Sequence, residues 1–423
     1  MVLDETNTEG WRCRRKTPGK MTVRRTWLLM KGGTMKTAVT AVFFLFCVVA
    51  LAFSAQVFRV DTAGAVKQAL ASAGPGDTIL VKPGEYDMGA TFSTGKSGTP
   101  DKPVTFRCEG DKGYAKFKVN GQIGFRIRSR YWVIQGIHVE GSSKSTQAVV
   151  FMDGPGGCGD VKILDCKFSA SSQHGMKAAR TSEKAVDNVL LDHVEIYDTG
   201  ATAFDLVSGD NWVLRNCYVH DYGKAGGVTY GIFLKGGGKN GIIEGCFVDG
   251  GKRATTVGIS FGGGLTGKQW LPKAGDNVAP EHEGGIARNN IVVNTADVAY
   301  HSNNGSRCFF YNNLAWGCKG FQRQASYPPD PVLVNNLIAG SYAGASKESR
   351  NNLNKIEKTW FVNADEYDFR LTAEGSAVLD GKGEELADNP VDYFGTKRKS
   401  GPQCLGPVLP DATQSTRWTD RRK

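Results

Sequence analysis

Side chains that can transfer protons or bind charged groups recur at alternate positions in a series of short apolar segments. Lys235 follows Phe233 by two residues, and Asn303 follows His301 in the same way. Alternate residues of a β-strand lie on one face, so we expect these side chains to leave the core together. The predicted outward row is Lys177, Asp205, Phe233, Lys235, Ser260, His301, Asn303, Gln322 and Gln324. A long polar row of mixed charge with an aromatic ring suits an extended polymer better than a small metabolite.

A second group of reactive side chains lies in the stretch Gly262 to Glu283, which contains Trp270, Glu281 and His282. Long loops on a rigid scaffold often carry function, and this one would emerge beside the predicted row. Glycoside hydrolysis requires two carboxyl groups about 5 to 9.5 Å apart. Asp205, Glu281 and Glu283 could supply them, so hydrolysis is one interpretation of this group.

The elements that would position these side chains are the units of an internal repeat. Each unit is a short apolar stretch, a glycine or polar corner and a second alternating stretch. The first apolar residues after the corners are Ile137, Cys166, Val194, Cys217, Cys246, Ile291, Leu314 and Leu337, spaced by 23 to 29 residues except for one step of 45. The excess of the long step falls in Gly262 to Glu283. Such a unit is too short for a propeller blade and suits one coil of a parallel β-helix, with coils stacked about 4.8 Å apart.

The corner residues support the same fold. They are Gly136, Asp165, His193, Asn216, Gly245, Asn290, Asn313 and Asn336. Glycine, asparagine and aspartate tolerate the left-handed backbone that a corner needs. We expect the asparagines to stack and to hydrogen-bond along the axis, and Cys166, Cys217 and Cys246 to point inward as small apolar side chains. Cys308 with Cys318, and Cys158 with a neighbour, are candidates for disulfides.

The first and last coils of a β-helix have unpaired strand edges and need capping elements. Residues 63–73 read as a short helix capped by Asp61 or Thr62, which would close the N-terminal coil. The repeat fades beyond Gly340, with a last strand over 367–371. We predict a β-helix domain over residues 56–395 and an irregular basic tail over residues 396–423.

Residues 1–55 read as a signal peptide preceded by an upstream extension from a mis-called start codon. An apolar run from Ala38 to Phe53 follows Met35 and Lys36 and ends in small residues. A retained N-terminal anchor is the alternative. Because no second apolar span follows, we expect a secreted protein, extracellular or periplasmic, with no stable membrane span after processing.

The net charge of +10 does not indicate a nucleic-acid partner. Residues 1–55 hold nine Lys and Arg against three Asp and Glu, so +6 of the charge lies there. The remainder of the chain is only mildly basic, and we predict no nucleic-acid binding.

Two segments resemble the opening of right-handed β-helix proteins that act on carbohydrates. They run from Ala69 to Tyr86 (ALASAGPGDTILVKPGEY) and from Gly98 to Phe106 (GTPDKPVTF). The chain resembles the alginate lyase and chondroitinase B type of polysaccharide lyase, with a fold-level likeness over residues 57–380 and a catalytic likeness confined to a few residues. The resemblance implies an all-β, right-handed, pectin-lyase-like solenoid with a short N-terminal capping helix, acting on an acidic polysaccharide.

The resemblance also implies a catalytic residue. In these lyases the motif Ile-x-x-Lys bears the general base, and Ile232-Phe-Leu-Lys235 matches it. Lys235 would then abstract the C5 proton of a uronate. A lysine is a poor base at neutral pH unless a cationic neighbour or desolvation lowers its pKa, and Arg253 and His301 are the candidate neighbours. His301 could serve as acid or as a second base.

Other positions depart from the lyase pattern. The arginine of the next strand is replaced by Gly262, and the acidic pair that holds calcium is replaced by Val228 and Tyr230. Neutralising the substrate carboxylate would fall to Asn303, Gln322, Arg253 or a metal held by Asp205. Nothing in the sequence requires a cofactor, and binding of a divalent cation such as calcium is possible. A non-catalytic glycan-binding protein is a further alternative, and the sugar and the oligomeric state stay open.

Overall fold

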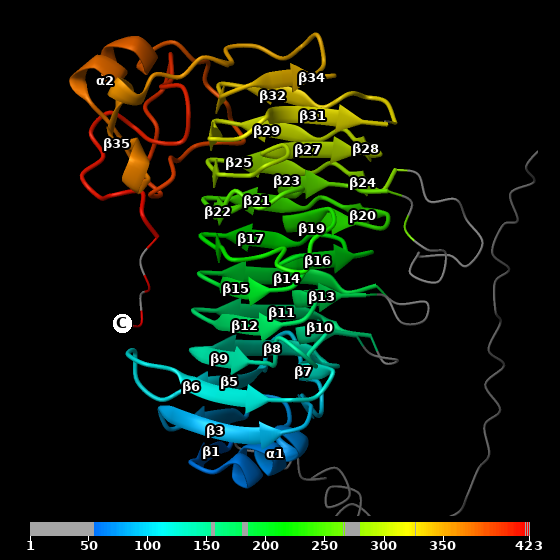
Figure 1. Cartoon of the computed structure of the whole chain (residues 1–423). Helices are drawn as coiled ribbons and strands as arrows, with labels where there is room; N and C mark the ends of the chain where they lie inside the picture. The colour runs from blue at the N-terminus through cyan, green and yellow to red at the C-terminus, as the bar shows by residue number, and fades with distance from the viewer. Residues whose placement is uncertain are drawn as a thin grey trace, which may run out of the picture. The chain divides into compact units, whose positions relative to one another are not determined.

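The computed structural model describes residues 55–153, 157–179, 185–264, 266, 280–325, 327–418, 420 and 422. Residues 1–54 of the predicted signal peptide and Trp270, a candidate substrate-binding residue of the long stretch, lie outside these residues. The body consists of stacked coils, and three parallel sheets form its faces. Each strand pairs with the equivalent strand of the next coil (Figure 1). The chain is therefore an all-β parallel β-helix, as the repeat predicts.

The strands fall into three long sheets, which we call A, B and C. Sheet A consists of β1 (Val57–Val60), β2 (Thr78–Val81), β5 (Val104–Cys108), β8 (Arg130–Gln135), β11 (Gly159–Leu164), β14 (Asp187–Asp192), β17 (Val213–Arg215), β21 (Ile242–Glu244), β25 (Ile286–Arg288), β29 (Phe309–Tyr311) and β32 (Val332–Val334). Sheet B consists of β3 (Gly84–Gly89), β6 (Ala115–Val119), β9 (Ile137–Glu140), β12 (Lys167–Ser171), β15 (Glu195–Thr199), β18 (Tyr218–Val219), β22 (Phe247–Asp249), β26 (Ile291–Val293), β30 (Leu314–Trp316) and β33 (Leu337–Ile338). Sheet C consists of β4 (Phe92–Ser93), β7 (Ile123–Ile127), β10 (Ala148–Met152), β13 (His174–Ala178), β16 (Phe204–Val207), β19 (Thr229–Lys235), β23 (Thr256–Phe261), β27 (Tyr300–Asn303), β31 (Gly320–Gln324) and β34 (Ser341–Ala343).

Smaller elements complete the fold. A short parallel sheet, D, joins β20 (Gly238–Lys239), β24 (His282–Glu283) and β28 (Gly305–Ser306). The helix α1 (Ala63–Ser72) buries Val66, Ala69 and Leu70 over the first coils, and Thr62 caps it by accepting a hydrogen bond from Ala65. The prediction of an N-terminal capping helix is confirmed. No helix of the described chain has the length and apolar character needed to cross a bilayer.

The corners differ from the prediction in the later coils. Asp165, His193, Asn216 and the corner glycines have positive φ as expected, but in the later coils Asn289, Asn312 and Asn335 turn the corner. Asn290, Asn313 and Asn336 are fully buried one position later, and Ile291 pairs with Phe247 rather than with Cys246. The predicted register was therefore wrong by one residue from Ile291 onward.

The buried asparagines explain this shift. The side-chain oxygen of Asn290 accepts the backbone N–H of Cys246 at 2.9 Å, and Asn313 and Asn336 do the same for the coil before each of them. Their amide groups also donate to neighbouring backbone carbonyls, for example Asn313 to Ala287. A buried amide is tolerated only when its hydrogen bonds are satisfied, and this ladder satisfies them. The predicted asparagine stack along the axis is confirmed.

The interior is apolar elsewhere. Cys166, Cys217 and Cys246 are fully buried in it, as predicted. All eight described cysteines are free, so neither candidate disulfide, Cys308 with Cys318 or Cys158 with a neighbour, is present.

The chain beyond the last coil covers the outside of sheet B. Single bridges to Arg350 and Leu353 end the solenoid. Then follow η2 (Lys358–Trp360), β35 (Phe361–Asn363), η3 (Ala364–Glu366), β36 (Asp368–Leu371) and α2 (Ala373–Leu379). The predicted last strand at 367–371 is β36, which is antiparallel to β35 and lies outside the coils. Apolar side chains of this layer pack on Ile291, Leu314 and Leu337.

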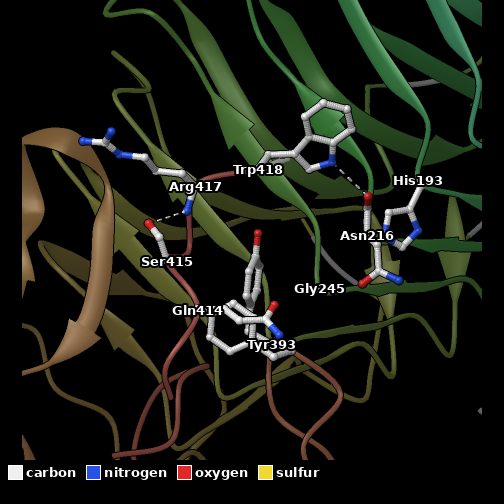
Figure 2. Close-up of a pocket in the computed structure, with 9 residues that line it drawn as sticks. His193, Asn216, Gly245, Tyr393, Gln414, Ser415, Arg417 and Trp418 are labelled. Atoms are coloured by element: carbon white, nitrogen blue, oxygen red, sulfur yellow. Dashed lines mark hydrogen bonds between the residues drawn. The ribbon is translucent and has the colours of Figure 1, made fainter. Parts of the chain in front are cut away.

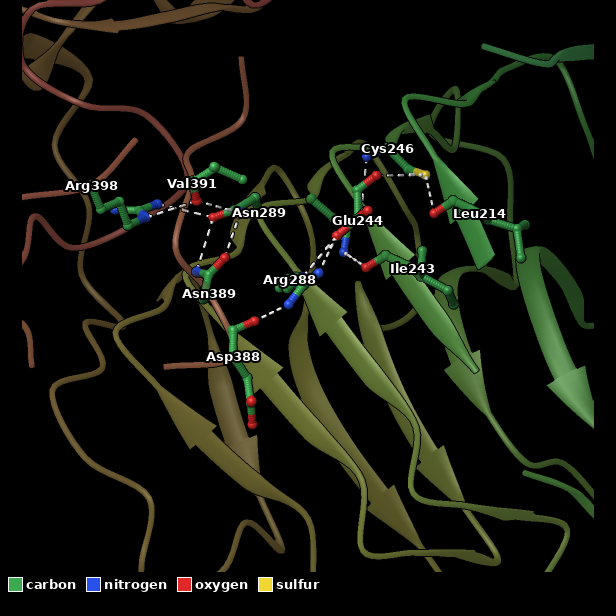
Figure 3. Close-up of polar contacts among 11 residues, drawn as sticks. Leu214, Ile243, Glu244, Cys246, Arg288, Asn289, Asp388, Asn389, Val391 and Arg398 are labelled. Atoms are coloured by element: carbon green, nitrogen blue, oxygen red, sulfur yellow. Dashed lines mark hydrogen bonds and ion pairs between the residues drawn. The ribbon is translucent and has the colours of Figure 1, made fainter. Parts of the chain in front are cut away.

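Polar contacts hold this layer to the corner between sheets A and B (Figure 3). Arg398 is buried and donates to Asn289 at 2.9 Å and to the carbonyl of Val391 at 3.0 Å. Asn289 and Asn389 exchange hydrogen bonds between their side chains. Residues 396–418 contain no helix or strand, yet these contacts fix them on the solenoid.

Candidate functional site

The outward row on sheet C has the predicted register. Lys177 pairs with Asp205, Asp205 with Phe233, and Phe233 with Ser260. His301 and Gln322 continue the same row. The residues that alternate with them point inward and are fully buried: Met176, Phe204, Ile232, Ile259, Tyr300 and Phe321. Two further residues, Arg126 and Phe151, extend the row toward the N-terminal coils.

Asp205 is the centre of the row. Its carboxylate is 3% exposed and contacts two ammonium groups from different strands. Lys177 donates a hydrogen bond to Oδ2, and Nζ of Lys235 lies 3.3 Å from Oδ1. Burial alone would raise the pKa of Asp205, but the charges of Lys235 and Lys177 outweigh it and lower the pKa to about 2. Two ammonium groups against one carboxylate leave one excess positive charge here.

Lys235 lies at the end of β19 among aromatic rings. Its Nζ is 4.3 Å from the centroid of the Phe233 ring, and that ring stacks on Tyr230 with centroids 3.8 Å apart. The first residues of the long loop pass over it: a Cβ atom at Gly263 would collide with Phe233 and lie 3.6 Å from Cδ of Lys235. The sequence did not indicate Tyr230 as a site residue. Its spacing of three residues from Phe233 does not match strand alternation, because the side-chain positions of Gly231 and Ile232 both face the interior.

His301 and Ser260 form a buried pair beside these rings. Nδ1 of His301 lies 3.3 Å from Oγ of Ser260, which also donates to the carbonyl of Gly262. Burial lowers the pKa of His301 to about 4. Its Nε2 has no hydrogen-bond partner within the described residues. A neutral imidazole can accept a proton but cannot supply one, so this geometry favours a role as base over a role as acid.

Glu281 does not reach the row as a free carboxylate. It is 1% exposed, and its oxygens accept hydrogen bonds from the backbone N–H of Gly236 at 2.8 Å and of Thr266 at 2.6 Å. The hydroxyl of Thr266 is a third donor to it. Glu281 therefore ties the long loop to the residue that follows Lys235.

His282 and Glu283 also lie away from the row. His282 is fully buried, stacks on Phe261 and accepts the N–H of Gly241, and burial lowers its pKa to about 3. Glu283 pairs with Lys239 and Arg307 on sheet D. The predicted carboxylate set for hydrolysis is thus not assembled, because each of its loop members is engaged in another structural contact.

Arg253 is likewise distant from Lys235. It forms an ion pair with Asp221 at 2.9 Å, before β23 begins, whereas Lys235 ends the neighbouring strand. The cation that shares a partner with Lys235 is Lys177 instead. Asn303 and Gln322 do lie on the sheet C face, in coils beyond Ser260.

The residues near Asp205 do not fit a metal ion. Both of its oxygens face ammonium groups. The described part of the chain contains no group of three or more His, Cys, Asp or Glu side chains that could hold a metal.

A hollow of about 210 Å³ adjoins the centre of the row on its N-terminal side. Its lining residues are Ile123, Gln147, Ala148, Phe151, Gln173, His174 and Lys177. His174 Nε2 lies 3.7 Å from Asp205, which connects the hollow to the centre. The sequence-based row stopped at Lys177. Applying the same strand alternation to the preceding coil would have predicted Phe151 as part of the row. Gln147 and Gln173 come just before their strands begin, so strand alternation does not predict where their side chains lie.

A second hollow, of about 160 Å³, lies elsewhere, at the corner between sheets A and B (Figure 2). His193, Asn216 and Gly245 line it from the corners of the coils, and Tyr393, Gln414 and Trp418 line it from the C-terminal layer (Figure 2). The indole of Trp418 donates to the carbonyl of Asn216 at 3.3 Å. Its lining includes no carboxylate.

Comparison with known proteins concerns the fold. A family model described as right handed beta helix region matches residues 135–265. No curated protein matches the chain. The handedness of the solenoid is therefore that of the right-handed parallel β-helix.

Several solved structures are similar in fold. An alginate lyase from Paenibacillus sp. str. FPU-7 is 15% identical, with 69% of this chain and 99% of that chain covered and a TM-score of 0.42. The pectate lyase Pel9A is 17% identical, with 84% and 96% covered and a TM-score of 0.49. A rhamnogalacturonan lyase is 16% identical, with 79% and 94% covered and a TM-score of 0.48. At these identities the likeness extends to the fold alone.

Proposed function

We propose that the protein is a secreted polysaccharide lyase that binds an acidic polysaccharide along the row on sheet C and cleaves it by β-elimination. The observation that carries this proposal is the pair of lysines, Lys177 and Lys235, around the buried carboxylate of Asp205. The cluster has one excess positive charge, which suits one uronate carboxylate. Aromatic rings beside it can pack on the faces of sugar rings.

The reaction needs a cation for the substrate carboxylate, a base for the C5 proton and a proton for the leaving oxygen. Lys177 binds the carboxylate in this proposal at the centre of the row, where its ammonium group and that of Lys235 share Asp205. Lys235 is an ammonium group while it pairs with Asp205, so it first releases one proton to solvent and then removes the C5 proton with the electron pair that this frees. The C4–O4 bond then breaks, a C4=C5 double bond forms, and the leaving oxygen takes up a proton.

Tyr230 is the proposed source of that last proton. Burial raises its pKa, so its hydroxyl is protonated at neutral pH, and its ring lies against Phe233 next to Lys235. His301 is neutral at that pH and can only accept a proton. Asp205 keeps the two lysines in place and takes no proton itself.

The test is to incubate the purified protein with alginate, polygalacturonate, chondroitin and heparan and to follow ultraviolet absorbance. Only elimination creates the unsaturated, absorbing product. We expect absorbance to rise with one of these polymers and to vanish in Lys235→Ala. New reducing ends without absorbance would indicate hydrolysis, and retention of a glycan without either signal would indicate a binding protein.

Two variants separate catalysis from binding and folding. Lys235→Arg keeps a cation but lacks a usable base, so it should retain the polymer and lose elimination. Lys162→Ala removes an exposed lysine from sheet A and should keep full activity. Loss of activity in both lysine-to-alanine variants would point to a general electrostatic effect and contradict the role of Lys235.

A further inference from the structure

The hollow beside Lys177 offers uncharged groups to a ligand. Gln147 and Gln173 lie on its rim with exposed side chains, and neither carboxamide makes a hydrogen bond within the described residues. Phe151 supplies an aromatic ring, and Ile123 and Ala148 supply aliphatic surface. Such a lining hydrogen-bonds hydroxyl or acylamino groups and packs on the apolar face of a sugar ring.

The charged groups around this hollow are already compensated. Arg126, one coil before Phe151, donates to Asp153 at 2.7 Å, and that carboxylate is buried. Lys177 shares Asp205 with Lys235. His174 is neutral at physiological pH, because burial lowers its pKa to about 4. The one excess positive charge belongs to the centre of the row and not to the hollow.

We propose that this hollow binds an uncharged sugar unit, and hence that the substrate alternates uronate units with uncharged sugars. This inference rests on the proposed lyase function and specifies its substrate class. A polymer with a carboxylate on every unit would place a second carboxylate in the hollow without a free cation. Removing an ionised group from water without a partner is costly, so binding would select against that polymer.

The spacing of the rings supports an extended site. Phe151, Lys177, Asp205 and Phe233 occupy successive coils. At about 4.8 Å per coil, Phe151 and Phe233 are about 14 Å apart, with the charged centre between them. Phe233 itself is buried beneath Gly263, so the half-buried rings of Phe151 and of Tyr230, which stacks on Phe233, are the ones that can hold sugar units on the two sides of the uronate that reacts.

The experiment compares two kinds of polymer with the full-length protein. Alginate and polygalacturonate carry a carboxylate on every unit, whereas hyaluronan and unsulfated chondroitin alternate uronate with an N-acetylated sugar. We expect kcat/KM from product absorbance to be about tenfold or more higher for the alternating polymers, which corresponds to about 1.4 kcal/mol. Equal or faster cleavage of the homopolymers would overturn the inference and leave the lyase proposal intact.

Variants of the lining make the test specific. Phe151→Ala should raise KM for the alternating polymers severalfold with little change in kcat, because the ring binds without taking part in the reaction. Gln173→Lys should shift the preference toward the homopolymers by adding a cation. Lys162→Ala, on sheet A, is the control. An unchanged preference in Gln173→Lys would count against the hollow as the selecting site.

The absence of any absorbance would refute the lyase proposal and still leave the inference testable. Retention of the same four polymers in affinity electrophoresis would then be compared between the wild type and Phe151→Ala. Stronger retention of the alternating polymers, lost in the variant, would support an uncharged sugar in the hollow. Equal retention of all four polymers would overturn it.

Discussion

The buried carboxylate of Glu281 accepts a hydrogen bond from the backbone N–H of Gly236 at 2.8 Å. Gly236 directly follows Lys235, so the carboxylate fixes the end of the strand that bears the proposed base. The same carboxylate holds Thr266 through two further hydrogen bonds. It thereby couples the start of the long loop to the row, although Glu281 does not face the proposed substrate.

Replacing Glu281 by glutamine should destabilise the fold and reduce activity. One carboxylate oxygen becomes an NH₂ group, which cannot accept the hydrogen bonds that Gly236 or Thr266 donates to that oxygen. Hydrogen bonds to charged groups contribute about 1.5–3 kcal/mol each, so we expect a loss of about 2 kcal/mol in urea unfolding. Glu283→Gln, on the more exposed sheet D, is the matched control and should cost less than about 1 kcal/mol. Equal stabilities of the two variants would contradict this role of Glu281.

Asp205 should make the fold sensitive to acid. Its folded-state pKa of about 2 lies below the ordinary value of 3.8, so its contribution is complete above about pH 4 and is lost as the pH falls toward 2. The difference corresponds to about 2 kcal/mol. Asp205→Asn should be less stable than the wild type at pH 6 and should lose less stability between pH 4 and pH 2. If the unfolding free energies of the two proteins changed in parallel with pH, Asp205 would not be a source of the acid sensitivity.

The buried histidines should reduce the stability of the fold at a higher pH than Asp205 does. Burial lowers the pKa of His138, His174 and His301 to about 4 and that of His282 to about 3. The unfolded chain therefore binds more protons below pH 6.5, and stability falls as the pH is lowered from there through the folded-state values. Each histidine contributes about 1.4 kcal/mol per pH unit over that range.

The measurement for this prediction is urea unfolding between pH 7 and pH 4. His301→Gln should show a shallower loss of stability than the wild type by about 1.4 kcal/mol per pH unit. Proton NMR of the imidazole should show no titration of His301 between pH 5 and pH 8. A midpoint near 6.5 would mean that the ring is solvated and protonated in the site.

The asparagine ladder should be indispensable in the later coils. Asn313 accepts the backbone N–H of Asn290 and donates to the carbonyl of Ala287, both within the core. Asn313→Leu leaves these buried groups without partners, at a cost of about 1–3 kcal/mol each. Asn354→Ala, at an exposed position, should change the unfolding free energy by less than about 0.5 kcal/mol. Similar values for both variants would contradict a structural role of the ladder.

The sequence alone was sufficient for the fold and for the order of the row. Strand alternation separates Phe204 from Asp205 and Ile232 from Phe233, because successive side chains of a strand point to opposite faces of the sheet. The sequence did not predict which residue of each Asn–Asn doublet turns the corner, because either residue tolerates the left-handed backbone. Which asparagine is buried depends on a hydrogen bond with the neighbouring coil. The burial of Ile291 on the outer side of sheet B could not be predicted either, because the residues that pack on it come from the C-terminal layer, far away in the sequence.

Partners that are far apart in the sequence were decided only by the tertiary structure. Lys235 has Asp205 and Phe233 beside it and not Arg253, and the carboxylate of Glu281 serves the backbone of Gly236 rather than a substrate. Periodicity reports which side of a strand a residue occupies, because burial is a local requirement repeated in every coil. Pairing between charges and the path of a loop depend on distances across coils, and no local pattern encodes those distances.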